Sequence, residues 1–191
     1  GSIVGVKTRR SPARFSARTL LAACFAAALA VGAAANAQTP PRTVPDTIAQ
    51  RMQACTPCHG REGRASPVGY LPRIAGKPAG YLFNQLANFR DGRRYNAAMS
   101  HLVEQLSDDY LREIAEYFAG LDVPYPPPPA TTEREGVLRR GEALATRGDF
   151  HRRLPACTQC HGYALTGAQP AIPGLLGLPA DYVIGQLGAW K

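Results

Sequence analysis

The chain contains the stretch Cys55-Thr56-Pro57-Cys58-His59-Gly60 and, further on, a near copy of it, Cys157-Thr158-Gln159-Cys160-His161-Gly162. These two copies hold four of the five cysteines in the 191-residue sequence. Two thiols separated by two residues and followed directly by an imidazole are typical of covalent haem attachment, in which both thiols bind the porphyrin and the histidine binds the iron. The repeated stretch therefore indicates two c-type haems.

The motif alone leaves two alternatives to haem open, a zinc site and a redox-active pair of cysteines. A structural zinc site takes four separated ligands, whereas each copy offers one histidine directly after its second cysteine and no other pair nearby. A redox dithiol or disulfide needs only the two cysteines and gives the histidine no role. Covalent haem uses all three residues, so we favour haem over zinc or a dithiol.

A second axial ligand decides whether the iron is closed for electron carriage or open to small molecules. The two methionines of the chain are Met52, on an apparent core helix face before the first motif, and Met99, forty residues after His59 in a polar loop. A thioether stabilises ferrous iron and suits an electron carrier of high potential. We therefore expect His59 and Met99 to bind the first iron, with a loop methionine packed in the core as the alternative.

The second iron is expected to take His161 as its proximal ligand. No methionine follows His161 in this sequence, so its sixth ligand is expected beyond Lys191. His151 precedes its own motif by only ten residues and is a weaker candidate, and His101 beside Met99 is expected to be a solvated loop residue.

The duplication divides the chain into two modules. Residues 76–90 match residues 177–191 at six of fifteen positions with an offset of 101, while the two histidines are offset by 102, so one copy has a one-residue gap. Between the modules lies the proline-rich run 123–129, which favours a stiff spacer. We expect a signal peptide, a first module, a linker and a second module that is incomplete at its C-terminal end, over residues 1–37, 38–122, 123–130 and 131–191.

Apolar spacing and capping residues predict an all-α fold with long loops and no convincing strand. The clearest helix runs from Ser107 to Gly120, with a capping serine, two acids in its first turn and apolar residues at helical spacing. Further helices are expected from the same signals at residues 48–55, 78–89 and 137–145.

Net charge and export are linked in this sequence. Of the 22 basic residues five lie before residue 38, where there is no acid, so the formal charge falls from +8 to +3 without that segment and a nucleic-acid partner is not expected. The segment has a basic stretch, an apolar run over residues 20–35 and the small-residue site Ala35-Asn36-Ala37. These zones predict a cleaved secretory signal and a periplasmic protein, with an uncleaved anchor as the alternative.

The combination of motifs resembles the dihaem class I c-type cytochromes of the cytochrome c4 family. The resemblance covers nearly all of residues 45–191, and its residues are the two haem motifs together with Pro72-Arg73-Ile74-Ala75-Gly76, Tyr81-Leu82, Gln85-Leu86, Phe89-Arg90-Asp91-Gly92-Arg93-Arg94, Met99 and Leu106-Ser107-Asp108. It implies two tandem class I cytochrome c domains related by a pseudo-two-fold axis.

The resemblance also implies roles for single residues. The carbonyls of Pro72 and Pro173 would accept the proximal imidazole N–H groups of the two histidines, and Arg73 would lie near a haem propionate. The counterpart of Arg73 in the second module is Gly174, which leaves that contact without an equivalent at the second haem.

The function implied is single-electron carriage between a respiratory donor and a terminal oxidase or reductase, with no catalytic residue and with redox proteins as partners. Peripheral association with the membrane stays open. The alternative is a haem enzyme, or the cytochrome subunit of a sulfide or thiosulfate dehydrogenase, that uses the second haem as its active site.

Replacement of Cys55 and Cys58 together by alanine is expected to leave the first module largely unfolded, because a module of roughly 75 residues needs the haem as apolar surface. Circular dichroism and thermal unfolding of the exported variant, measured beside the unaltered protein, check this expectation. Native-like helicity and thermal stability without that haem would contradict it.

Overall fold

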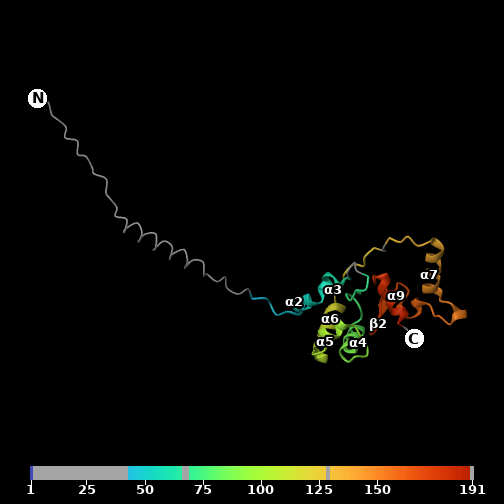
Figure 1. Ribbon diagram of the computed structural model, residues 1–191, viewed down its shortest axis with the longest axis horizontal. Coiled ribbons are helices and arrows are strands. Elements are labelled where there is room, and N and C mark those ends of the chain that lie inside the picture. Colours follow the sequence, from blue (N-terminus) through green and yellow to red (C-terminus); the bar gives the residue numbers. More distant parts are fainter. Residues whose placement is uncertain (2–42, 66–68, 128–129, 190–191) are drawn as a thin grey trace. The chain divides into compact units, whose positions relative to one another are not determined.

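The structure is a computed structural model that describes residue 1 and residues 43–65, 69–127 and 130–189 (Figure 1). The predicted signal peptide therefore lies, apart from Gly1, outside the described residues. Within those ranges, no helix is both long and apolar enough to cross a membrane.

Short helices joined by long loops make up the region from Val44 onward (Figure 1). In the first module they are α2 (Ile48–Arg51), the 3-10 turn η1 (Met52–Ala54), α3 (Thr56–His59), η2 (Arg61–Gly63), α4 (Ala79–Arg90), α5 (Ala97–Val103) and α6 (Asp108–Ala119). In the second module they are α7 (Glu135–Arg147), η3 (Phe150–Arg152), α8 (Cys157–His161), the strands β1 (Gly167–Ala168) and β2 (Ile172–Pro173), and α9 (Ala180–Gly188). The prediction of a mainly helical fold is confirmed.

The expectation of no strand is wrong at one place. Strands β1 and β2 pair in antiparallel fashion, with Gly167 opposite Pro173 and Ala168 opposite Ile172. The loop after α8 doubles back through three turn residues, and this brings two short backbone segments together. Such a pairing carries no alternating apolar pattern, which is why periodicity did not show it.

Capping residues set the ends of the main helices where the sequence predicted them. The Ser107 side chain accepts a hydrogen bond from the Tyr110 backbone N–H at 3.3 Å and caps α6, which ends at Gly120. Helix α4 begins after Pro78, and α9 begins after the corresponding Pro179. Proline suits these positions because no helical hydrogen bond is lost there.

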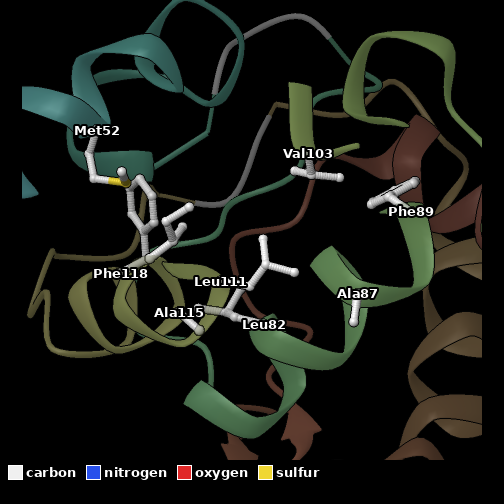
Figure 2. Packing of buried hydrophobic residues seen from close by; sticks show 9 residues of the cluster. Met52, Leu82, Ala87, Phe89, Val103, Leu111, Ala115 and Phe118 are labelled. Atoms are coloured by element: carbon white, nitrogen blue, oxygen red, sulfur yellow. The ribbon is translucent and has the colours of Figure 1, made fainter. Parts of the chain in front are cut away.

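The hydrophobic core lies in the first module, where α4 and α6 pack against each other (Figure 2). Its buried members are Met52, Leu82, Ala87, Phe89, Val103, Leu111, Ile114, Ala115 and Phe118. Met52 belongs to this cluster, as the helix face before the motif predicted. The first module thus has an apolar centre of its own, built largely by α4 and α6.

The second module buries much less of its apolar surface. In the described part of the chain, α7, α8 and α9 contain no buried residue. Val137 and Leu138 on α7 are exposed, and so are Leu154, Ile184 and several other large apolar side chains of this module.

One guanidinium joins the two modules at corresponding positions. Arg94 donates to Gln85 of α4 at 2.7 Å and to Gln186 of α9 at 2.9 Å, two glutamines that the offset of 101 pairs with each other. Arg94 also donates to Tyr182 at 3.0 Å and stacks on Phe89. A contact shared by corresponding residues agrees with two repeats related by a pseudo-two-fold axis.

Replacement of Leu111 by alanine is expected to lower the free energy of unfolding by about 2–5 kcal/mol, because this side chain is 0% exposed in the centre of the core. The Leu102→Ala variant is the control, since Leu102 is 54% exposed and its loss should change stability by less than about 0.5 kcal/mol. Denaturant titration of the holoprotein measures both. Equal destabilisation by the two variants would contradict this account of the core.

Candidate functional site

The first cysteine motif forms a single helical turn. Cys55 lies at the N-terminal end of α3, Pro57 lies in its first turn, and the helix ends at His59. Residues three and four apart on a helix share one face. The fold therefore presents Cys55, Cys58 and His59 on the same side of α3, as attachment at two thiols and one imidazole requires.

The ring of His59 is held by a backbone carbonyl. Its Nδ1 lies 2.8 Å from the carbonyl oxygen of Pro72, and since a carbonyl can only accept, Nδ1 carries the proton and donates it. The ring is 8% exposed, and this burial lowers the pKa of His59 against the smaller opposing effect of the Pro72 carbonyl. The imidazole is therefore neutral near pH 7, with Nε2 left as a metal ligand.

The glycine that ends each motif has a backbone reason. Gly60 has φ of +76°, and a Cβ at this position would lie 2.2 Å from the Ala65 carbonyl oxygen. Gly162 occupies the same left-handed region with φ of +82°. The motif is thus a six-residue unit in which the chain turns sharply after the histidine.

The second motif repeats this arrangement on α8. The Nδ1 atom of His161 lies 2.7 Å from the carbonyl oxygen of Pro173 and donates to it. The loop from histidine to proline is one residue shorter than in the first module, so the gap inferred from the two offsets falls within this loop. Both proximal contacts implied by the resemblance are therefore present.

The two loops are also closed by the same backbone contacts. The carbonyl of Gly63 accepts hydrogen bonds from the N–H groups of Ile74 and Ala75, both at 2.9 Å. The corresponding carbonyl of Leu165 accepts from the next copies of these residues, Leu175 at 2.8 Å and Leu176 at 3.1 Å. Different side chains thus support one loop geometry, which holds the proline carbonyl beside the histidine in each module.

Met99 lies on a helix and not in a loop, which corrects the interpretation of its surroundings. The Asn96 side chain accepts from the Met99 backbone N–H at 3.1 Å and caps α5, so Met99 falls in the first helical turn. Its side chain is half-buried against the core cluster. A short capped helix fixes this thioether more firmly than a polar loop would.

The remaining histidines stand apart from the two motifs. His101 is largely exposed and lies 3.2 Å from a carboxylate oxygen of Glu104, and His151 is exposed on η3. No group of three or more His, Cys, Asp or Glu side chains that could hold a bare metal ion occurs in the region that the structure describes.

Two buried cations accompany the site. Arg73 donates to the carbonyls of Val123 and Pro124 and stacks on Tyr125, while its Nε has no partner among the described residues. Lys77 is also buried and donates to the Gly174 carbonyl. The sequence analysis did not identify Lys77. The repeat contained a signal for it, because Lys77 directly follows Gly76 and the offset of 101 pairs this charged residue with the apolar Leu178.

These features fit a covalently attached haem in each module. The donor set offers two thiols and a neutral imidazole nitrogen on one helical face, which suits a porphyrin iron. The unpartnered Arg73 Nε fits the anionic edge of such a group.

Several known proteins are similar to this chain. It is 39% identical over 138 residues to the thiosulfate dehydrogenase electron acceptor of Thiomonas intermedia, a match that covers 72% of this chain and 63% of that relative. It is 37% identical over 147 residues to cytochrome c4 of Pseudomonas aeruginosa, over 74% of this chain and 69% of that relative. The chain thus spans about 63% of the first relative's length. No protein-family model matches it.

Solved structures give the same relationship. Reduced recombinant cytochrome c4 from Pseudomonas stutzeri superposes with a TM-score of 0.62 at 30% identity, over 72% of this chain and 75% of that one. Thiosulfate dehydrogenase from Marichromatium purpuratum superposes with a TM-score of 0.63 at 34% identity, over 71% of this chain and 29% of that one. Sequence, fold and the twice-repeated proximal geometry agree, and the chain belongs to the cytochrome c4 family, whose members carry two covalently bound c-type haems.

Proposed function

We propose that the protein is a periplasmic dihaem electron carrier. The observation that carries this proposal is the pair of proximal histidines, each held at Nδ1 by a proline carbonyl at 2.8 Å or 2.7 Å. A hydrogen bond of this kind fixes the ring and raises the basicity of Nε2 toward a metal. The same geometry in both modules suits two irons that exchange electrons, and not one carrier haem beside an unrelated group.

The proposed attachment residues are Cys55 and Cys58 in the first module and Cys157 and Cys160 in the second, with His59 and His161 as proximal ligands. The haem supplies reversible one-electron chemistry at its iron when bound. The polypeptide holds each imidazole in one tautomer and offers Met99 as the second ligand of the first iron. We place the domain boundaries at residues 38–122, 123–130 and 131–191, after a cleaved signal over residues 1–37.

We further propose that the donor is a sulfur-oxidising dehydrogenase. Support comes from two proteins that are similar to this chain, one from Thiomonas intermedia and one from Stutzerimonas stutzeri. Both are called thiosulfate dehydrogenase electron acceptors, and they are 39% and 36% identical to this chain. Within residues 38–191 every cysteine lies in one of the two motifs, which counts against a cysteine thiolate as an axial ligand in this part of the protein. In this proposal the carrier receives its electrons from the enzyme.

Rapid mixing of the oxidised full-length holoprotein with a thiosulfate dehydrogenase and thiosulfate is expected to reduce both haems. Thiosulfate without the enzyme should leave the protein oxidised, because the proposal assigns thiosulfate oxidation to the dehydrogenase. Absorbance of the reduced haems follows the reaction. Reduction by thiosulfate alone would contradict the proposal and favour the alternative, in which the second haem is an active site.

Replacement of Met99 by alanine is expected to remove the weak absorption band of methionine-bound ferric haem at about 700 nm from the first haem and to lower its reduction potential, because a soft ligand to ferrous iron is lost. The reduced variant should also bind carbon monoxide. The Met52→Leu variant is the matched control, since Met52 lies in the core cluster. Loss of the band in the control, or its full retention in the Met99 variant, would exclude Met99 as the ligand.

A further inference from the structure

Arg73 and Lys77 are buried cations at the junction of the two modules. Their exposed fractions are 2% and 3%. Neither forms an ion pair with a carboxylate in the described part of the chain, although eleven pairs elsewhere do so. The carboxylate of Asp122 acts on Arg73 from beyond ion-pair distance, whereas no carboxylate influences Lys77. A buried ammonium without a counter-ion is unfavourable, since desolvation penalises its charge.

The Lys77 ammonium crosses from one module to the other. Its Nζ donates to the carbonyl of Gly174. Gly174 directly follows Pro173, whose own carbonyl holds the proximal His161. The ammonium of the first module therefore lies beside the backbone that positions the second proximal histidine.

The internal repeat shows which residues of the two modules correspond at the contact between Lys77 and Gly174. Arg73 directly follows Pro72, the residue that holds His59, and the offset of 101 pairs Arg73 with Gly174. The same offset pairs Lys77 with Leu178. The second module thus has an uncharged residue at both positions, and the Lys77 ammonium donates to the backbone of Gly174, the residue that corresponds to Arg73.

The surroundings of Lys77 favour an anion beside it. Burial, and secondly the charge of Arg73, lower the pKa of Lys77 to about 8. One carbonyl satisfies only one of the three ammonium N–H groups. The carboxylates of an attached haem are anions of suitable chemistry for the remaining donors, and they would stabilise the charged form.

We propose that Lys77 binds a carboxylate of the second haem across the module junction, as a positioning residue supplied by the first module. The inference rests on the proposed two-haem carrier. A cation held at that carboxylate favours the reduced state of the nearby iron, because it offsets the negative charge that the electron brings. Lys77 thereby raises the potential of the second haem relative to a module without it.

The test is a redox titration of the full-length dihaem protein and its Lys77→Gln variant, with each potential assigned to its haem by NMR of the haem methyl groups. Loss of the charge is expected to lower the potential of the second haem and to shift the equilibrium between the two irons about tenfold toward an electron on the first. The Lys77→Arg variant, which keeps a cation, should remain close to the unaltered protein.

The Arg139→Gln variant is the matched control, because it removes one positive charge from the exposed surface of the second module. It should leave both potentials unchanged, since solvent screens an exposed charge. An unchanged second potential in Lys77→Gln, or an equal shift in the control, would overturn the proposal.

A variant that fails to assemble still leaves a decisive measurement on the unaltered holoprotein. Nuclear Overhauser contacts between the Lys77 side chain and the propionate protons of the second haem are expected, and their absence would refute the proposal. These titrations use no partner protein. Failure of electron delivery from a dehydrogenase would therefore count against the proposed function and not against Lys77.

Discussion

The hydrogen bond from a histidine Nδ1 to a proline carbonyl is the contact on which each module depends. It fixes the tautomer of His59 and of His161, and it turns Nε2 of each ring into the atom available for a metal. Pro72 lies in a loop without regular structure, whereas Pro173 lies in the two-residue strand β2. Paired backbone hydrogen bonds to the carbonyls of Gly63 and Leu165 hold the two segments in place. Short backbone contacts of this kind, and not a long helix, therefore orient each histidine ring.

The two modules differ in how many of their apolar side chains are buried in the described part of the chain. The first has a core in which α4 and α6 enclose Leu111, whereas no residue of α7, α8 or α9 in the described chain is buried. A covalently attached group of large apolar area compensates for a small core. Thioether bonds to such a group can therefore matter for the folding of a small module as well as for its chemistry.

The junction between the modules is polar and is built mostly from the first module. Arg94 donates to Gln85 and to its repeat counterpart Gln186, and Lys77 donates to the Gly174 carbonyl. Arg73 and Lys77 correspond to the uncharged Gly174 and Leu178, so the two repeats differ in charge at these positions. Such a difference is a physical means of making the two sites inequivalent, since one site contributes cations that the other lacks.

By itself the sequence determined the local features of this protein. The spacing of Cys55, Cys58 and His59 indicated haem attachment, Ser107 and Gly120 determined the ends of α6, and the offset of 101 determined the duplication, because each depends on neighbouring residues or on repetition. Tertiary structure decided the rest. The burial of Lys77 against Gly174 joins residues that lie 97 positions apart in the chain, and such a contact leaves no periodic pattern to read. The helical turn at Met99 and the pairing of β1 with β2 are local, but both are too short to give a periodic pattern in the sequence.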